Sequence, residues 1–359
     1  MEALGIVPEF WRGRRVLVTG VTGFKGGWLA LWLRQMGATV TGYSLAPPTT
    51  PSLYDAARLN GDVSWTEADV RDLSALRRTI SECAPEVVFH LAAQPLVRAS
   101  YECPVDTFAT NVLGTVNVLD ALRGQAATRA IVIVTSDKCY ENRAWSWPYR
   151  ETDQLGGHDP YSSSKACAEI VASSYYRSFF KVRHVGVATA RAGNVIGGGD
   201  WARDRLLPDI ITALHARESV LIRNPGSMRP WQHVLEPILG YLALAERLAS
   251  DTERETASES WNFGPAQEAV QPVSALVASV CALWGEGAQW HTSQQLQPHE
   301  ATILALDASK ARARLAWRPR LTLDEALSWT TRWYKAFYAG GDMREYTVRQ
   351  IREYQEVVT

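Results

Sequence analysis

The chain has 359 residues, of which 46% are hydrophobic and 21% charged, and its formal net charge is −1. This composition is typical of a globular protein with one large domain or two closely joined domains, and it excludes a long disordered chain. Because the net charge is near zero, there is no electrostatic basis for binding nucleic acid or an anionic membrane, and neither is expected as a partner.

The cysteines are scattered, and their number is odd, with no CxxC pair: Cys83, Cys103, Cys139, Cys167 and Cys281. This pattern favours reduced thiols over a disulfide framework or a zinc site, so no metal is expected. No run approaches 18 apolar residues, and the first residues lack the basic and apolar pattern of a signal peptide. We therefore expect a cytoplasmic protein.

A strand, a glycine-rich turn and a helix are predicted near the start of the chain. Residues 14–19 favour a short strand, residues 20–27 read GVTGFKGG, and residues 28–36 carry apolar side chains at helical spacing. This is the context that a dinucleotide-binding fingerprint requires, although the spacing is GxxGxxG rather than GxGxxG. A cofactor diphosphate would then lie at the helix N-terminus. The expected contacts come from Gly20, Thr22, Gly23, Phe24, Lys25 and Gly26.

The second strand is predicted at 38–43 and the third at 63–67. An acidic residue that holds the ribose hydroxyls usually follows the second strand, but this chain has Ser44 there, so this position leaves NAD and NADP open. No arginine stands beside it, which argues mildly against a 2′-phosphate. Asp69 and Val70 follow the third strand and are expected near the adenine, although Asp69 could instead cap the next helix.

The fourth strand is predicted at 86–93 and ends in small residues that a cofactor could approach closely, namely Leu91, Ala92 and Ala93. His90, on the same apolar strand, is interpreted as a hydrogen-bonded core histidine. Residues 105–122 have helical periodicity and include Asn111, a further expected cofactor contact. The strand ends therefore contribute most of the predicted cofactor site.

The fifth strand, at 130–134, delivers the polar sequence Thr135-Ser136-Asp137-Lys138. In an open α/β sheet, ligands bind at the carboxyl ends of the strands. A hydroxyl, a carboxyl and an amine side by side can carry out proton chemistry there. About 25 residues later, Tyr161 and Lys165 lie four apart on one face of a predicted helix, where the ammonium would lower the pKa of the tyrosine from its usual value of about 10.

In this order, the glycine turn, the strand-end hydroxyl and the YxxxK pair resemble the extended short-chain dehydrogenase/reductase family. Within it, the sequence resembles the CDP-glucose 4,6-dehydratases from about residue 11 to 334. The segments that carry this resemblance are 22–26, 93–98, 135–140, 191–201 and 229–237.

The resemblance implies an α/β fold: a Rossmann-like doubly wound parallel sheet with a smaller, mostly C-terminal substrate-binding α/β domain. The NAD-binding domain is expected at 11–196, with segments around 229–264 returning to it. Residues 197–359 would mainly bind the nucleotide-sugar. The polar stretch 250–260 is predicted to be a surface loop, and 206–215 is expected to belong to the smaller, later part. The C-terminal third is predicted to be mostly helical, with 324–338 as its clearest amphipathic segment.

The resemblance also implies conversion of CDP-glucose to its 4-keto-6-deoxy sugar with bound NAD. Tyr161 would accept the C4 hydroxyl proton, Lys165 would support it, and Ser136 would orient the same oxygen. Asp137 would protonate the departing C6 hydroxyl. The expected substrate contacts are Gln94, Asn194, Arg223, Arg229 and His299. Pairing of the helices at 105–123 and 161–180 would give a homodimer or homotetramer.

Lys138 stands where dehydratases that act on dTDP- or GDP-sugars carry a glutamate base, as it does in the CDP-glucose enzymes. We expect Lys138 to be the base at C5, which requires a neutral amine with a pKa of about 7–8. Alternatively, it stays charged and stabilises the enolate. Two other functions share the fold: a nucleotide-sugar 4-epimerase, which does not need Asp137 and Lys138, and a non-catalytic NAD(P)-binding regulator, which commonly lacks the Tyr/Lys pair.

Overall fold

The computed structural model describes residues 6–285, 287–292 and 304–357. Within these ranges, seven parallel strands form a central sheet in the order β11-β6-β5-β4-β1-β2-β3. Their bounds are β1 (Arg15–Thr19), β2 (Thr39–Ser44), β3 (Ser64–Glu67), β4 (Val87–His90), β5 (Ala130–Val134), β6 (Gly186–Arg191) and β11 (Ser260–Asn262). The predicted doubly wound, Rossmann-like sheet is confirmed.

Alternating side chains of the strands point into two separate hydrophobic cores. Val16 and Val18 of β1 belong to the larger core, whereas Leu17 between them belongs to the smaller one. This is the period of two that a strand buried on both faces produces.

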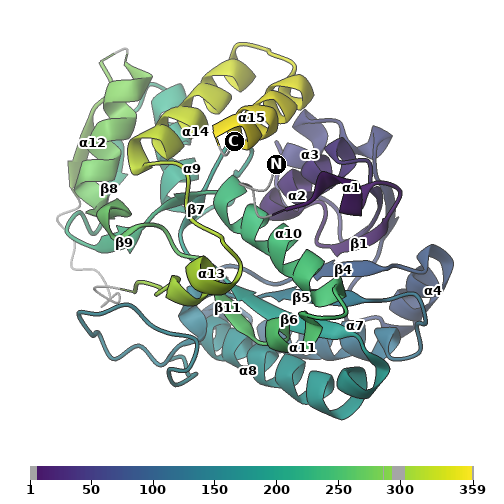
Figure 1. Cartoon of the computed structure of the whole chain (residues 1–359). Coiled ribbons are helices and arrows are strands. Elements are labelled where there is room, and N and C mark those ends of the chain that lie inside the picture. Colours follow the sequence, from purple (N-terminus) through teal and green to yellow (C-terminus); the bar gives the residue numbers. More distant parts are fainter. Residues whose placement is uncertain (1–5, 286, 293–303, 358–359) are drawn as a thin grey trace.

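Helices cover both faces of the sheet (Figure 1). The helices that contribute to the larger core include α2 (Phe24–Gln35), α10 (Leu235–Ala249), α14 (Leu323–Tyr338) and α15 (Met343–Val357). Those that contribute to the smaller core are α4 (Leu73–Cys83), α7 (Gly114–Leu122) and α8 (Pro160–Tyr175). In Figure 1, α8 lies at the bottom of the view, and α14 and α15 lie at the top.

In a doubly wound sheet, ligands bind where the strand order reverses, and in this sheet it reverses at β1. β1 pairs with β2 on one side and with β4 on the other. Crossover helices then leave the sheet on opposite faces, which opens a crevice at the carboxyl ends of these strands. The glycine turn follows β1 and the Thr135–Lys138 sequence follows β5, so both lie at this edge.

From residue 195 onward the chain builds three small two-stranded sheets among the described residues. They pair β7 (Val195–Ile196) with β10 (Gln232–His233), β8 (Val220–Ile222) with β13 (Trp290–Thr292), and β9 (Met228–Pro230) with β12 (Val270–Pro272). The helices α9 (Leu206–His215), α12 (Val273–Trp284) and α13 (Ser309–Arg314) accompany them. Helix α10 nevertheless packs on β5 and β6, so this part of the chain returns to the central sheet.

Most shorter helical segments connect the larger elements. They are α1 (Pro8–Trp11), α3 (Leu53–Ala56), α5 (Val97–Glu102), α6 (Pro104–Phe108) and α11 (Arg254–Ala257), with 3₁₀ turns at Leu59–Gly61, Asp137–Cys139, Lys181–Arg183 and Gln267–Ala269. The helix predicted at 105–122 is divided into α6, a π-helical turn at Ala109–Leu113 and α7. None of the helices in the described ranges is long and apolar enough to cross a membrane.

The prediction of a surface loop at 250–260 was wrong. This stretch forms α11, and β11 begins at Ser260. Arg254 and Ala257 are buried. A polar composition does not reveal such burial. Arg254 is buried even though it is charged, and its guanidinium pairs with Asp251 at 2.6 Å.

Candidate active site

A single cleft of about 2150 Å³ lies at the carboxyl ends of the strands. It brings together nearly all of the side chains predicted from the sequence. Those that line it are Gly20, Thr22, Gly23, Phe24, Lys25, Gly26, Asp69, Val70, Leu91, Ala92, Ala93, Ser136, Asp137, Lys138, Tyr161, Lys165, Asn194, Arg223 and Arg229. Gln94 and Asn111 do not line it, and His299 lies outside the described residues.

The glycine turn fits a dinucleotide diphosphate. Gly20 has φ +75°, and a Cβ at Gly26 would lie 2.1 Å from the Gly20 carbonyl oxygen, so a side chain at Gly26 is sterically excluded. Gly23 caps α2 without any side chain bonded to the helix N-terminus. The first N–H groups of α2 are therefore available to an anion, and the helix dipole favours negative charge there.

At the ends of β1, β2 and β3, hydroxyl groups and an ion pair hold the chain in place. Thr22 Oγ1 lies 2.7 Å from Ser44 Oγ and donates to the Leu45 carbonyl at 2.9 Å. The Asp69 carboxylate accepts from the backbone N–H of Arg71 at 2.8 Å and pairs with its guanidinium at 2.7 Å. Asp72, not Asp69, caps α4, so the capping alternative for Asp69 was wrong.

His90 is a hydrogen-bonded core residue, as predicted. Its Nδ1 lies 2.7 Å from Thr19 Oγ1 and its Nε2 lies 3.1 Å from Thr115 Oγ1. Burial, helped by the charge of Lys165, lowers the pKa of His90 to about 3. The imidazole is therefore neutral at physiological pH.

Asn111 and Gln94 fold the loop after β4 rather than face the cleft. Asn111 Oδ1 accepts from the Gln94 backbone N–H at 2.8 Å, and its Nδ2 donates to Ser164 Oγ of α8 at 2.8 Å. The Gln94 side chain donates to Leu96 O and Thr107 Oγ1. Asn111 thus ties the loop after β4 to α8, and Gln94 ties it to α6.

Ser136, Asp137 and Lys138 form a connected group at the end of β5. Ser136 Oγ donates to Asp137 Oδ1 at 2.9 Å, and Lys138 Nζ lies 3.2 Å from the same oxygen. Asp137 is 1% exposed, and its Oδ2 has no hydrogen-bond partner in the described part of the chain. The backbone of Gly193 packs on this carboxyl, because a Cβ there would lie 2.1 Å from Oδ2.

Tyr161 and Lys165 lie on the buried face of α8, which Asp159 caps by accepting from Ser162 N at 2.9 Å. Lys165 Nζ donates to the carbonyl of Val134, the last residue of β5, at 3.2 Å. Burial lowers the pKa of Lys165 to about 8. Burial also raises the pKa of Tyr161, and the charge of Lys138 and a hydrogen bond with Ser136 oppose this increase. The expected lowering by Lys165 is therefore not observed; Lys138 supplies the largest opposing charge.

The electrostatic surroundings of Lys138 favour the ammonium over the neutral amine that a base role requires. Burial alone would lower its pKa, but the charge of Asp137, the phenol of Tyr161 and the hydrogen bond to Asp137 together raise it above its usual value. An amine with a raised pKa stays an ammonium at neutral pH. The alternative of a charged Lys138 that stabilises negative charge agrees with this geometry, whereas a base role does not.

The pKa of Lys25 shifts in the opposite direction to that of Lys138. Burial and the charge of Arg205 lower the pKa of Lys25 to about 7, although Asp137 acts against them. Its neighbours also include Lys138 and Lys165, which repel an ammonium. The wall of the cleft formed by the first turn of α2 therefore carries an amine that is only partly charged at neutral pH.

The basic residues predicted to bind substrate lie on the C-terminal side of the cleft. Arg229 belongs to β9 and donates to the Met228 carbonyl at 3.0 Å. Arg223 lies 3.7 Å from Asp204, which also pairs with Arg98 at 3.0 Å. Asn194 has a positive φ of 40°, a conformation that asparagine tolerates better than most residues.

One charged pair at the cleft was missed by sequence reasoning. Arg205 Nη1 lies 2.8 Å from Asp200 Oδ2, and its charge acts on both Lys25 and Tyr161. Arg205 lies in the sequence 200–205, for which no role was predicted. The glycines at 197–199 signal close packing nearby: a Cβ at Gly198 would lie 2.0 Å from the side chain of Trp333.

Comparison with known proteins identifies the family. The sequence model of the GDP-mannose 4,6 dehydratase family matches residues 17–330. A CDP-glucose 4,6-dehydratase from Salmonella typhimurium is 51% identical over 359 residues, which cover 99% of each chain. The chain belongs to the CDP-glucose 4,6-dehydratase family. By contrast, a dTDP-glucose 4,6-dehydratase from Xanthomonas campestris is 26% identical over 89% of this chain and 92% of that relative.

Solved structures of more distant relatives share the fold of this dehydratase family. An epimerase from Methanothermobacter thermautotrophicus matches with a TM-score of 0.79 and 22% identity, over 96% of this chain and 97% of that one. A dTDP-glucose 4,6-dehydratase from Streptomyces venezuelae, solved with NAD bound, matches with a TM-score of 0.76 and 23% identity, over 92% and 99%. Because epimerases and dehydratases both match, the fold alone does not choose between the two reactions.

Proposed function

We propose that the protein is an NAD-dependent lyase that converts CDP-D-glucose to CDP-4-dehydro-6-deoxy-D-glucose and water. The reaction oxidises C4, eliminates water across C5 and C6, and returns hydride to C6. The observation that carries the proposal is the group formed by Ser136, Asp137 and Lys138 beside Tyr161 and Lys165 in one cleft. A 4-epimerase needs the hydroxyl, the tyrosine and the second lysine, but it has no use for an acid and a cation next to the serine.

Bound NAD supplies the hydride acceptor and donor for both redox steps. The glycine turn fits its diphosphate, because Gly26 leaves no space for a side chain and the α2 N-terminus has no side-chain cap. In this proposal, Thr22, Ser44 and Asp69 lie toward the adenosine, and Leu91 to Ala93 pass beneath the cofactor. The Lys165 ammonium holds the nicotinamide ribose, within reach of Tyr161.

The chain's own groups carry the proton chemistry. Tyr161 takes the C4 hydroxyl proton, and Ser136, which lies against both Tyr161 and Asp137, orients that oxygen. Lys138, as an ammonium, stabilises the negative charge that develops on the C4 oxygen when the C5 proton leaves. Asp137, a buried carboxylate with one free oxygen, takes the C5 proton and delivers it to the departing C6 hydroxyl, which leaves as water.

The nucleotide diphosphate would bind to the C-terminal side of the cleft. Arg229 and Arg223 offer guanidinium groups, which can pair two phosphate oxygens at once, and Asn194 offers an amide. This assignment goes with the proposed division into a cofactor domain at 11–196 and a mainly substrate-binding part at 197–359. His299 stays a prediction.

The test is a comparison of CDP-, dTDP-, GDP- and UDP-glucose, with the 4-keto product followed by mass spectrometry. The proposal expects CDP-glucose to lose the mass of one water and to turn over fastest. Turnover without loss of mass would indicate an epimerase. NAD binding without turnover of any of the four sugars would indicate a regulator.

We further propose that the protein is a homodimer or homotetramer in the cytoplasm, built through α6, α7 and α8. A shallow apolar groove crosses these helices, lined by Pro104, Val105, Phe108, Ala109, Val112, Leu113, Val116 and Cys167. Val105 is 79% exposed and Ile170 of α8 is 58% exposed, which is unusual for such large apolar side chains. Light scattering should give a mass above that of one chain, and Leu113→Glu should reduce it to the monomer mass.

A further inference from the structure

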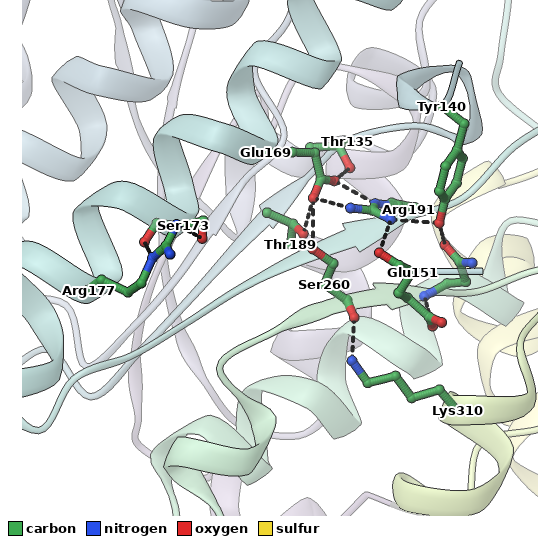
Figure 2. Close-up of polar contacts among 11 residues, drawn as sticks. Thr135, Tyr140, Glu151, Glu169, Ser173, Arg177, Thr189, Arg191, Ser260 and Lys310 are labelled. Carbon is green, nitrogen blue, oxygen red and sulfur yellow. Dashed lines mark hydrogen bonds and ion pairs between the residues drawn. The ribbon is translucent and has the colours of Figure 1, made fainter. Parts of the chain in front are cut away.

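The helix that carries Tyr161 and Lys165 also carries a buried carboxylate one turn further on, at Glu169. Glu169 forms a bidentate ion pair with Arg191 at the end of β6, with Nε–Oε1 at 3.0 Å and Nη2–Oε2 at 2.7 Å (Figure 2). The two side chains are 1% and 2% exposed. Neither group touches the cleft, so the proposed chemistry does not use them directly.

Every polar atom of the pair has a partner from a different segment. Thr135 Oγ1 donates to Glu169 Oε1, and Thr189 Oγ1 and Ser260 Oγ donate to Oε2 at 2.6 and 3.0 Å. Arg191 Nη1 donates to Tyr140 Oη at 2.6 Å. Figure 2 shows these contacts converging on Glu169 and Arg191 from Thr135, Thr189, Ser260 and Tyr140.

Two of these contacts fix α8 against the end of β5. Lys165 Nζ donates to the carbonyl of Val134, and the next residue, Thr135, donates to Glu169. Ser136 follows immediately. These two contacts therefore act as a clamp between α8 and the end of β5, and the clamp sets the position of Ser136 relative to Tyr161.

The carboxylate also acts electrostatically on Lys165. Burial lowers the pKa of Lys165, and the charge of Glu169 is the largest effect that raises it again. Burial would raise the pKa of Glu169 itself, but Arg191 and the hydroxyl donors hold it below its usual value. Glu169 is therefore a permanent anion, four residues from an ammonium that is close to losing its proton.

We propose that the Glu169–Arg191 pair is a positioning device for the reaction, which keeps Lys165 charged and holds it in register with Ser136 and Tyr161. A buried ion pair is a poor source of stability, because desolvation of the two charges offsets their attraction. We therefore assign the Glu169–Arg191 pair an effect on the charge and the position of Lys165, and not on stability. The proposal rests on the proposed function for the role of Lys165, but the charge of Lys165 can be measured without substrate.

The first experiment measures that charge directly. The chain has six lysines, so NMR of protein labelled at lysine Cε resolves few signals, and Lys165→Arg assigns the one of interest. Glu169→Gln keeps the shape of the side chain and its ability to accept from Thr135 but removes the charge. The Lys165 signal should then titrate at a lower pH, by about one pH unit. An unchanged titration overturns the proposal, whether or not the wild type turns over any sugar.

The second experiment follows the reaction. Glu169→Gln should reduce kcat about tenfold to a hundredfold with little change in KM, and the alkaline decline of kcat should move to lower pH. Glu236→Gln is the matched control, because Glu236 is also a buried carboxylate that accepts from two backbone N–H groups and from Tyr354, away from the cleft. If both variants lose stability but keep the wild-type pH profile, the pair is only structural and the proposal fails.

A milder variant covers the case in which Glu169→Gln does not fold. Thr135→Val removes the hydroxyl that donates to Glu169 at the end of β5. It leaves the ion pair of Glu169 with Arg191 and the hydrogen bond from Thr189 in place. We expect a lower kcat, an unchanged KM and a wild-type titration of Lys165, because geometry alone is disturbed. A kcat equal to that of the wild type contradicts the clamp. If the wild-type protein shows no activity with any of the sugars, that result counts against the proposed function instead.

Discussion

The charge of Lys138 decides how the protein handles the proton at C5, and two substitutions can determine it. Lys138→Met removes the amine, whereas Lys138→Arg keeps a positive charge that cannot be lost, because a guanidinium stays protonated throughout the working pH range. If Lys138 acts as an ammonium, the arginine variant should be at least about tenfold faster than the methionine variant. If it acts as a base, both variants should be equally slow.

The magnitudes favour the ammonium. Lys138 Nζ lies 3.2 Å from Asp137 Oδ1, and its side chain is 37% exposed. Two unit charges at this distance attract by about 1 kcal/mol in water and about 5 kcal/mol at an effective dielectric constant of 20, and the exposure places the real value toward the lower figure. Even an unperturbed lysine, with its reference pKa of about 10.4, has only roughly one amine in a thousand neutral at pH 7.4, a cost of about 4 kcal/mol. The surroundings of Lys138 raise its pKa further.

The assay measures two rates for each variant: formation of the 4-keto product and exchange of the C5 hydrogen with deuterated solvent. Lys138→Met should lose about a hundredfold to a thousandfold in both, as expected for removal of one electrostatic stabiliser, and Lys138→Arg should lose about tenfold or less. NAD binding by both variants is the folding control. An arginine variant as slow in C5 exchange as the methionine variant would refute the ammonium role.

Three further predictions test other parts of the structure. Gly26→Ala should abolish NAD binding, measured by quenching of tryptophan fluorescence, because its Cβ would meet the Gly20 carbonyl oxygen at 2.1 Å. Gly193→Ala should displace Asp137, whose Oδ2 lies 2.1 Å from the new Cβ, and slow water loss about tenfold to a hundredfold while NAD binding stays normal; equal slowing of C4 oxidation would contradict the assigned role. His90→Gln should become more stable relative to the wild type as the pH falls below about 6.5. The pKa of buried His90 is lowered to about 3, so only the unfolded wild type gains this proton. At pH 5 the difference in free energy of unfolding should shift by about 2 kcal/mol from its value at pH 7.5, measured by urea denaturation, and a constant difference would contradict a neutral histidine.

Features that depend on neighbouring residues could be predicted from the sequence. The glycine turn, β5 with the Ser136–Lys138 group and the start of α8 each combine a local pattern with a specific residue, such as the Asp159 cap. Their meeting at one cleft follows from the rule that parallel strands end at the same edge. The sequence therefore predicted most of the cleft-lining residues.

Features that depend on the distance in space between two side chains could not be predicted. The charge of Lys138 is set by the carboxyl oxygen 3.2 Å away, and adjacency in sequence does not give that distance. Arg205 reaches the cleft only because Asp200 holds it there. Glu169 looked like an ordinary polar residue of a helix, since its partner Arg191 is 22 residues away, at the end of β6.

The place of β11 has a consequence for the biosynthesis of this protein. Ser260 donates to Glu169, and Asn262 accepts a hydrogen bond from Tyr140, so residues near position 260 complete contacts that begin near position 140. While the chain is being synthesised, β6 is an open edge and the Glu169–Arg191 pair lacks one of its covers until about 70 more residues have emerged. Residues 11–196 therefore cannot reach their final packing without β11. A fragment that ends near residue 196 should aggregate or remain loosely packed, and joining the segment 235–264 to it should restore a closed sheet.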